Sequence, residues 1–440
     1  MGEAQFTVPR GMKDIEPEEM ARRIWLSDKI RSVLWNYGFQ ILEPSPLENL
    51  ETLEAKSGPE IREQVYWFKD KAGRNLGLRF DLTVGMTRMV ANRFDLPEPV
   101  KIASIGGMWR YDEPQFARYR YFTQWDVEIY GVADPSADAE IIAVGSDILD
   151  AVGLREHEIR LSNRKLVEGF LRSLGTQSQS ELEQLIRIID KLGKIGPGKA
   201  ERELSTAGLS EDKVKRILGF AELGGKPDEV LPSLEKQLPK GEMIEKGFKE
   251  LSGTIEAVEP LGKLSKCRVD LSIVRGIGYY DGMVFEAYDR AGEDLGSIFG
   301  GGRFDKLCRI YGKRDMPATG VAGGLERLML SLERKGLFPD TSQRPQVFVA
   351  MVSDKVRAET VNIVRKLRGS GIRTDYDLKQ RSLPKQLEYA DTIKVSIAVI
   401  VGPREVKEGK VRLKDMRTGT EKDVVFSSLV DEVAQRLARR

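Results

Sequence analysis

Three arginines and a stretch of alternating residues lie close together between positions 110 and 130. The arginines are Arg110, Arg118 and Arg120, and guanidinium groups bind phosphates through paired hydrogen bonds. Residues 121–130 then alternate and place one set of side chains on each face of a strand, namely Trp125, Val127 and Ile129 opposite Gln124, Asp126 and Glu128. The pattern favours a substrate that joins an amino group to a nucleotide. A solvated hairpin is the alternative when the segment is taken alone.

Two later segments add patterns rich in glycine and tyrosine. Residues 275–282 read Arg-Gly-Ile-Gly-Tyr-Tyr-Asp-Gly, and residues 319–330 read Thr-Gly-Val-Ala-Gly-Gly-Leu-Glu-Arg-Leu-Met-Leu. In this order, the three segments resemble motif 2, the histidine-specific motif and motif 3 of histidyl-tRNA synthetases, which are class II aminoacyl-tRNA synthetases. Further matching stretches extend the resemblance over nearly the whole chain, at residues 9–14, 79–83, 300–305 and 410–417.

The resemblance implies roles for the matching side chains in ATP and histidine binding. Two catalytic arginines, Arg110 and Arg275, are implied on opposite sides of the ATP α-phosphate, where fixed positive charge stabilises the developing negative charge. The implied ATP-binding set is Arg110, Asp112, Arg118, Glu326 and Arg327. The implied histidine-binding set is Asp81, Thr83, Arg110, Gln124, Glu128, Arg275, Tyr279 and Tyr280. A carboxylate and tyrosine hydroxyls can pair both nitrogens of a buried imidazole.

The sequence departs from the usual family pattern at four positions within these motifs. Asp81 stands where glutamate is usual, Gly278 where aspartate is usual, and Phe304 where tyrosine is common. Glu113 replaces a basic residue of the loop that meets the acceptor end of tRNA. We therefore expect other residues of that loop to contact the acceptor end, namely Gln115 and Arg120.

The reaction that the resemblance implies is activation of L-histidine by ATP, followed by transfer to the 3′ end of histidine tRNA. Mg²⁺ is expected to accompany ATP, whereas neither a metal site built from the protein alone nor zinc is expected. One alternative is a paralogue that regulates the first enzyme of histidine biosynthesis, which the terminal domain and residues 275–280 weigh against. Another is a class II synthetase for proline, threonine or glycine, which Glu128, Arg275 and the tyrosine pair weigh against.

The composition indicates a soluble globular protein of two or three domains. Of 440 residues, 40% are hydrophobic and 31% are charged, with no apolar run of about 18 residues and no secretory pattern at the start. Two cysteines, Cys267 and Cys308, give neither a disulfide framework nor zinc spacing, so we expect buried thiols and a cytoplasmic protein. The chain has a single histidine, His157, and its charged neighbours predict a surface position. A Ser-His-Asp triad or a multi-histidine metal site would need a histidine elsewhere in the chain, and the sequence has none.

The charge is unevenly distributed along the chain. Residues 345–440 hold 20 Lys and Arg against 13 Asp and Glu, a net charge of +7 that leaves −5 for the rest of a chain with net charge +2. A basic terminal region suits a polyanion such as tRNA, and a solvated basic surface is the alternative.

Periodicity predicts the elements that must position these residues. Residues 18–35 predict an amphipathic helix that leads to a strand resembling motif 1, which implies a homodimer. Alternating stretches to about residue 131 predict an antiparallel sheet, in which Arg79, Asp81 and Thr83 share one strand face, and residues 138–152 predict a helix. Between about 165 and 260, apolar residues at helical spacing predict a helical insertion, among them Leu182, Leu185, Ile186 and Ile189.

The second half of the chain predicts strands between residues 267 and 302, a helix over 320–334 and a separate terminal domain. In that domain, strands at 347–352, 372–376 and 397–401 alternate with helical stretches in a βαβ rhythm. The predicted fold class is therefore α+β with an α/β terminal domain. A class II catalytic domain is expected over residues 1–334, with an antiparallel sheet, flanking helices and the insertion at about 165–260. A C-terminal α/β anticodon-binding domain is expected over residues 345–440.

Overall fold

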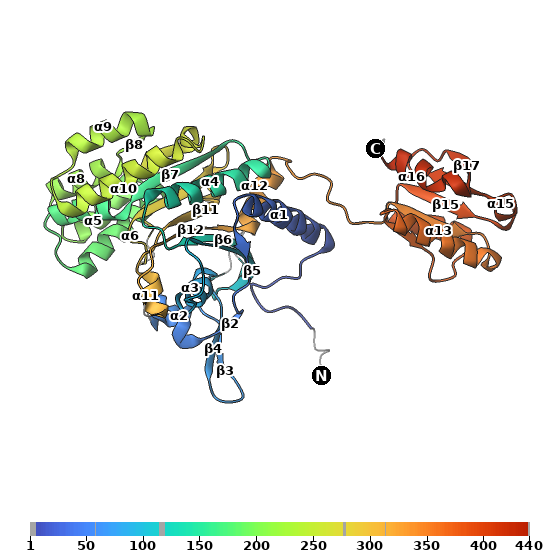
Figure 1. The fold of residues 1–440 in the computed structure, drawn as a ribbon, viewed down its shortest axis with the longest axis horizontal. Helices are drawn as coiled ribbons and strands as arrows, with labels where there is room; N and C mark the ends of the chain where they lie inside the picture. Colours follow the sequence, from blue (N-terminus) through green and yellow to red (C-terminus); the bar gives the residue numbers. More distant parts are fainter. Residues whose placement is uncertain (1–5, 58, 114–118, 276–278, 313, 439–440) are drawn as a thin grey trace. The chain divides into compact units, whose positions relative to one another are not determined.

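A computed structural model describes residues 6–57, 59–113, 119–275, 279–312 and 314–438. The chain forms two compact units, Met1–Pro339 and Asp340–Arg440, and each is described by itself (Figure 1). Three residues that carry sequence predictions, Gln115, Arg118 and Gly278, lie outside the described residues.

The first unit is built on one large sheet, which has nine strands among the described residues, in the order β1-β5-β6-β12-β11-β10-β7-β9-β8. Neighbouring strands run antiparallel except for the β1–β5 and β7–β9 pairs. The strands are β1 (Gln40–Ile41), β5 (Val100–Trp109), β6 (Tyr121–Tyr130), β7 (His157–Asn163), β8 (Gly224–Gly225), β9 (Cys267–Asp270), β10 (Met283–Asp289), β11 (Phe299–Arg303) and β12 (Ala318–Gly324). The β6–β12 pairing brings segments that are far apart in the sequence side by side.

Three helices pack near the centre of this sheet, namely α1 (Pro17–Asn36), α4 (Pro135–Ala151) and α12 (Leu325–Arg334). The apolar side of β6 is buried in the core beneath them, since Trp125, Val127 and Ile129 are all buried. Helix α4 begins after Asp134, whose carboxylate accepts a hydrogen bond from the backbone N–H of Ser136 at 2.9 Å. The predicted helices at 18–35 and 138–152 and the predicted apolar face of residues 121–130 are confirmed.

A smaller sheet in the order β2-β4-β3 carries the segment 79–83 to the large sheet. Its elements are β2 (Leu47–Asn49), α2 (Leu50–Ser57), β3 (Trp67–Lys69), β4 (Asn75–Leu78) and α3 (Thr83–Ala91). The prediction that Arg79, Asp81 and Thr83 share a strand face is wrong, because β4 ends at Leu78 and α3 begins at Thr83. The carboxylate of Asp81 accepts a hydrogen bond from the backbone N–H of Val84 at 2.9 Å, which favours a helix start over a continued strand.

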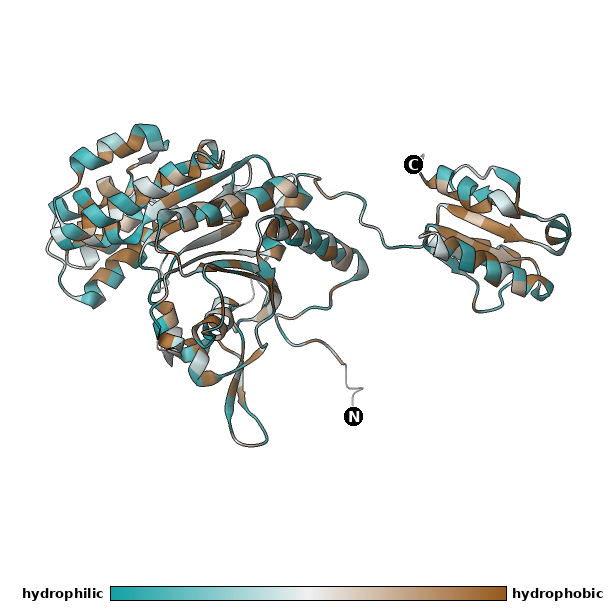
Figure 2. Ribbon diagram, in the orientation of Figure 1, coloured by the Kyte–Doolittle hydropathy of each residue, from teal (hydrophilic) through white to brown (hydrophobic). Residues whose placement is uncertain are grey.

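Six helices form the insertion between β7 and β9, and they pack into the same core as the large sheet. The predicted apolar stripe is confirmed, since all four of its residues on α6 are buried. Figure 2 shows these helices with one hydrophobic and one hydrophilic side, as expected for helices that cover a core. The helices are α5 (Arg164–Ser173), α6 (Gln179–Ile195), α7 (Pro197–Thr206), α8 (Glu211–Ala221), α9 (Pro227–Gln237) and α10 (Glu242–Val258).

The glycine-rich segment 318–324 is a strand, so the predicted helix over 320–334 is wrong in its first part. Strand β12 pairs with β6 on one side and β11 on the other, and α12 begins only at Leu325. The glycines leave room for rings that lie over the strand. A Cβ at Gly323 would lie 2.6 Å from the Trp125 ring, which explains why the strand carries glycine at this position instead of a residue with a bulkier side chain.

The second unit contains a five-stranded sheet in the order β14-β13-β15-β16-β17 among the described residues. The first three strands are parallel and β16 and β17 complete the sheet as antiparallel strands. The predicted βαβ rhythm is confirmed, and Figure 2 shows the central strands as the most hydrophobic part of this unit. The elements are β13 (Val347–Met351), α13 (Arg357–Gly369), β14 (Thr374–Tyr376), α14 (Leu383–Thr392), β15 (Ile397–Val401), α15 (Pro403–Lys407), β16 (Lys410–Asp415), β17 (Glu421–Val425) and α16 (Leu429–Ala438).

His157 is fully buried at the start of β7, so its predicted surface position is wrong. Its Nδ1 lies 2.8 Å from the Leu154 carbonyl and its Nε2 lies 2.8 Å from Ser146 Oγ, which satisfies a neutral imidazole. Burial lowers the pKa of His157. Both cysteines are buried, as predicted, and burial raises the pKa of Cys267 and of Cys308 to about 12.

Candidate active site

A cavity of about 220 Å³ lies over the polar side of β6 and the neighbouring β12. It collects nine of the side chains to which the family resemblance assigns a role, although they come from four separate parts of the chain. These nine are Asp81, Thr83, Arg110, Asp112, Gln124, Glu128, Arg275, Tyr279 and Tyr280. The cavity therefore combines two guanidiniums with carboxylates, an amide and phenol hydroxyls.

The polar side of β6 supplies two almost fully buried carboxylates, Asp126 and Glu128. Asp126 lies 3.5 Å from the hydroxyl of Thr83, and Glu128 accepts a short hydrogen bond from the Tyr130 hydroxyl. The Tyr130 hydroxyl also lies 3.0 Å from that of Thr87, and burial together with Glu128 raises the pKa of Tyr130 well above its ordinary value. Tyr130 therefore stays protonated and donates to Glu128, which fixes the carboxylate in the cavity.

The sequence places Asp126 on the polar face of this strand together with Gln124 and Glu128, and the structure confirms that position. Tyr130 was missed, although it also occupies an even-numbered position of β6. In a strand, positions that differ by two share a face, so this parity was the signal that could have identified Tyr130.

Arg110 is placed at the cavity by the end of strand β5. Its Nε donates to the Phe80 carbonyl at 2.9 Å, and its Nη2 lies 3.4 Å from the Gln124 side-chain oxygen. The guanidinium lies over the Phe122 ring at 5.0 Å, a favourable cation–π geometry. These contacts hold the planar group at the edge of the cavity while leaving it half-exposed.

Arg275 lines the cavity with a backbone in the left-handed region and with its side chain over a glycine. Its φ of 50° lies in the left-handed region, which is uncommon for a residue with a Cβ and is frequent at functional sites. The guanidinium passes over Gly300 of β11, where an added Cβ would lie 1.4 Å from Nη1. The absence of a side chain at Gly300 is therefore a condition for the observed position of Arg275.

In the described part of the chain, the buried guanidinium of Arg275 has few partners that offset the cost of burying its charge. Its Nη1 lies 3.6 Å from a Glu286 oxygen, and its guanidinium lies 5.4 Å from the Tyr280 ring centroid. Among the described residues, its Nε and Nη1 are buried without a hydrogen-bond partner. Burial acts to lower the pKa of Arg275, but the oxygens of Tyr280 and Glu286 outweigh it, so the pKa is raised and the group stays cationic. Such a group is suited to receive an anion.

The two tyrosines form one wall of the cavity. Their ring centroids are 4.5 Å apart and their hydroxyl oxygens are 3.3 Å apart. Tyr279 also meets the Phe304 ring edge-on at 6.0 Å, so the phenylalanine at this position still packs against the pair. Burial, followed by the charge of Asp81, raises the pKa of Tyr279, which keeps its hydroxyl available as a donor.

Three predicted residues do not line the cavity. The Glu326 carboxylate accepts hydrogen bonds from the Thr123 backbone N–H at 3.0 and 3.2 Å and pairs with Arg23 at 2.8 Å. Arg327 is exposed and donates to the Ser297 carbonyl at 2.5 Å.

The third is Arg120, which is buried and donates to the backbone carbonyls of Asp112 and Arg10 at 3.0 and 3.3 Å. It also stacks over the Tyr111 ring at 4.0 Å, so in this structure it ties the N-terminal segment to the segment after β5. Nearby Glu113 is exposed and pairs with Arg10 at 3.3 Å.

The described residues contain neither a metal-binding cluster nor a membrane-spanning helix. In that part of the chain, no group of three or more His, Cys, Asp or Glu side chains is arranged to hold a metal ion. None of the helices found there has the length and hydropathy needed to cross a bilayer.

Comparison with known proteins identifies the family. A family model described as histidyl-tRNA synthetase matches residues 11–328, and one described as an anticodon binding domain matches residues 346–436. The chain belongs to the histidyl-tRNA synthetase family. The histidine–tRNA ligase of Pyrococcus horikoshii is 38% identical over 431 residues, which cover 98% of this chain and 99% of that protein.

Solved structures agree with this family assignment. The histidyl-tRNA synthetase of a Nostoc species is similar with a TM-score of 0.85 and 31% identity, covering 98% of this chain and 99% of that one. A Bacillus halodurans structure described as an ATP phosphoribosyltransferase regulatory subunit/histidyl-tRNA synthetase has a TM-score of 0.76 at 23% identity, which shows a shared fold alone. The predicted fold class, a class II synthetase catalytic sheet with flanking helices and an α/β terminal domain, is confirmed.

Proposed function

We propose that this histidyl-tRNA synthetase family member activates L-histidine with ATP in the 220 Å³ cavity and then transfers the histidine to the 3′ end of histidine tRNA. The observation that carries the proposal is the meeting of Arg110 and Arg275 with Glu128 and the tyrosine pair in one cavity. Membership of the family supports the same reaction, that of an aminoacyl-tRNA ligase.

The histidine side chain would lie against Glu128 and the tyrosine pair. An imidazole has two nitrogens that must both be paired when it is buried, and an unpaired one costs about 1–3 kcal/mol. The Glu128 carboxylate can accept one N–H, and a hydroxyl of Tyr279 or Tyr280 can pair the second nitrogen. The ammonium group of histidine would be bound by Asp81, Thr83 and Gln124, which line the same cavity as Glu128.

The α-phosphate of ATP would lie between Arg110 and Arg275. The histidine carboxylate then attacks phosphorus in line, its new P–O bond forms as the bond to pyrophosphate breaks, and the two guanidiniums neutralise the growing charge. Asp112 would accept a hydrogen bond from the adenine amino group. We propose that Arg118 and Arg327 bind the outer phosphates of ATP. Glu326, at the start of α12, is proposed to contribute to ATP binding.

Mg²⁺ would enter with ATP as part of that substrate rather than in a cage of protein ligands. Its preference for phosphate and carboxylate oxygens suits the outer phosphates, which extend from the Arg110–Arg275 pair. We propose no zinc.

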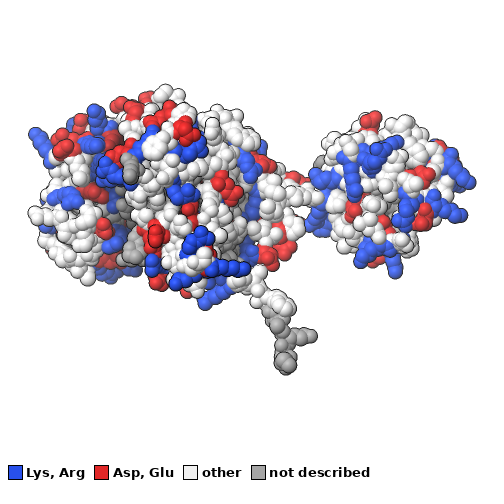
Figure 3. Space-filling view, turned by 60° about the horizontal axis from the view of Figure 1, so that its bottom comes forward, with Lys and Arg blue, Asp and Glu red and all other residues white. Residues whose placement is uncertain are grey.

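The second unit is proposed to bind the anticodon region of tRNA, and the catalytic and anticodon-binding domains are proposed to span residues 1–334 and 345–440. The net charge of +7 over residues 345–440 supports a polyanionic partner. Lys and Arg side chains are distributed over the face of this unit that Figure 3 shows. Gln115 and Arg120 are proposed to meet the acceptor end of the tRNA.

A homodimer in the cytoplasm is proposed from the motif 1 resemblance. Helix α1 leaves three large apolar side chains exposed, Met20, Ile24 and Trp35, which supports a covering surface from a second copy.

The experiment that tests the proposed function is ATP–pyrophosphate exchange with each of the twenty amino acids in turn. Exchange that depends on histidine alone, and that Arg275→Ala abolishes, is the expected result. Glu128→Gln should raise the KM for histidine far more than that for ATP, and Glu113→Gln, a change in an exposed acid outside the cavity, serves as its matched control. Absence of histidine-dependent exchange would contradict the proposal and favour a regulatory protein.

A further inference from the structure

One residue of the helical insertion binds both ends of the segment that carries the active-site tyrosines. Arg164 is the first residue of α5 and is almost fully buried. Its Nη1 donates to the backbone carbonyl of Arg275 at 3.3 Å, and its own backbone N–H donates to the Gly282 carbonyl at 2.9 Å. Both contacts come from one residue, so the start of α5 is tied to Arg275 and to Gly282, which lie on either side of the tyrosine pair in the sequence.

Arg164 is itself held by the insertion. Its Nε donates to Glu168, one turn later on α5, at 2.7 Å. A guanidinium can bind this carboxylate and the Arg275 carbonyl at once through different nitrogens, which a lysine ammonium cannot do in the same geometry.

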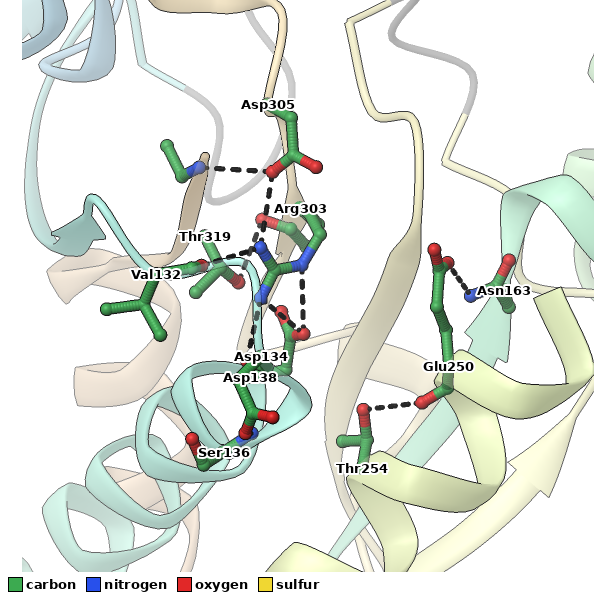
Figure 4. A network of polar contacts seen from close by, with 12 residues as sticks. Val132, Asp134, Ser136, Asp138, Asn163, Glu250, Thr254, Arg303, Asp305 and Thr319 are labelled. Atoms are coloured by element: carbon green, nitrogen blue, oxygen red, sulfur yellow. Dashed lines mark hydrogen bonds and ion pairs between the residues drawn. The ribbon is translucent and has the colours of Figure 1, made fainter. Parts of the chain in front are cut away.

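The start of α5 is fixed from the other side by α10. Asn163 caps α5 by accepting from the Lys165 N–H at 2.9 Å, and Glu250 of α10 accepts from the Lys165 ammonium at 2.6 Å. Glu250 also accepts from the Asn163 side chain at 2.9 Å (Figure 4). Helix α10 approaches so closely that a Cβ at Gly247 would lie 2.6 Å from the Leu166 backbone nitrogen. The insertion thus presents Arg164 from a rigid base.

The backbone at Arg275 needs such support, because its φ of 50° is costly for a residue with a Cβ. We propose that Arg164 is a positioning residue that holds Arg275 in this conformation and holds the tyrosine pair in place, and thereby makes the histidine pocket depend on the helical insertion. The proposal rests on the proposed function for its kinetic consequences but not for its structural ones.

The test compares the full-length wild type with Arg164→Met and with a matched control, Arg172→Met, the same substitution on the same helix. Arg172 is exposed and its Nη2 donates to the Gln179 side chain at 3.3 Å, and among the described residues it makes no hydrogen bond to Arg275 or Gly282. For Arg164→Met we expect the rate of histidine-dependent pyrophosphate exchange to fall about tenfold or more and the KM for histidine to rise, while the KM for ATP stays within about twofold. Arg172→Met should leave the exchange rate and both KM values near wild type.

Amide hydrogen exchange supplies a readout that does not depend on activity. Peptides covering Tyr279 to Met283 should exchange faster in Arg164→Met than in the wild type, and no faster in Arg172→Met. If Arg164→Met does not fold, Arg164→Lys, which keeps the charge, should show the same changes in smaller measure. Unchanged exchange in these peptides, or an equal kinetic loss in Arg172→Met, would overturn the proposal. Loss of histidine-dependent activity in the wild type itself would instead overturn the proposed function and leave the hydrogen-exchange result to decide.

Discussion

Replacing Gly300 with alanine is expected to disable the active site while largely sparing the fold. The new Cβ would lie 1.4 Å from Arg275 Nη1 and 2.7 Å from Cζ, whereas the nearest backbone atom, the Phe285 carbonyl oxygen, would be 3.2 Å away. The guanidinium is the far end of a flexible side chain, so it is the group that must give way. To reach an ordinary contact it has to move by about 2 Å.

A displacement of this size is large on the scale that catalysis tolerates. A misplacement of about 1 Å can cost about 10²-fold in rate, and loss of one electrostatic donor at a developing charge costs about 10²–10³-fold. We therefore expect Gly300→Ala to lower histidine-dependent pyrophosphate exchange by about 10²-fold or more, close to the effect of Arg275→Ala.

Two other glycines provide the comparison. At Gly301 a Cβ would lie 2.1 Å from the Gly320 backbone oxygen, so Gly301→Ala should distort the sheet and lower the melting temperature strongly. At Gly193, on α6, a Cβ meets no atom within 4 Å, so Gly193→Ala should leave both exchange and melting temperature unharmed. Exchange by Gly300→Ala within twofold of wild type would refute the reasoning that Arg275 must occupy this space to act.

Three further perturbations address stability and domain roles. His157→Asn should flatten the pH dependence of the free energy of unfolding, which urea denaturation at several pH values measures. Burial lowers the pKa of His157 in the folded state below its unfolded value of about 6.5. The stability of the wild type is therefore complete above about pH 6.5 and falls as the pH drops below that value. An unchanged slope would contradict this. Arg303→Met removes the guanidinium that binds buried Asp138 at 2.7 and 3.0 Å (Figure 4) and should cost about 3–5 kcal/mol of unfolding free energy, whereas Arg334→Met, at an exposed pair, should cost little. A chain that ends at Pro339 should retain pyrophosphate exchange while losing most tRNA charging, and equal loss of both would argue against a separate tRNA-binding role for the second unit.

The parts of the fold that could be predicted from the sequence are those with strong local periodicity. Residues 121–130 alternate cleanly, and the stripe on α6 recurs at helical spacing, so local pattern and tertiary burial agree. The cavity residues could be anticipated because three motifs stand in a fixed order. Their convergence comes from the β6–β12 pairing, which no local pattern reveals.

The predictions that were wrong depend on long-range contacts. Residues 318–324 have the small residues of a turn or helix entrance, and only pairing with two distant strands makes them a strand. His157 has charged neighbours in sequence, but its alternation with Ile159 and Leu161 points it inward, where Ser146 and the Leu154 carbonyl satisfy its nitrogens. Burial of a polar residue is decided by such partners, which a reading of sequence neighbours does not include.

The contacts of Arg164 lay beyond prediction for a related reason. Its partner at Arg275 is a backbone carbonyl, and a carbonyl is present at every residue, so no residue type marks it as an acceptor. The space above Gly300 is likewise defined by a side chain from another part of the chain.

The most direct measurement of the central claim is a crystal structure of the enzyme with a nonhydrolysable histidyl-adenylate analogue. We expect the phosphate-mimicking group between the guanidiniums of Arg110 and Arg275, and the imidazole between Glu128 and the hydroxyls of Tyr279 and Tyr280. An analogue bound with its phosphate mimic away from both arginines, or with its imidazole outside this cavity, would contradict it.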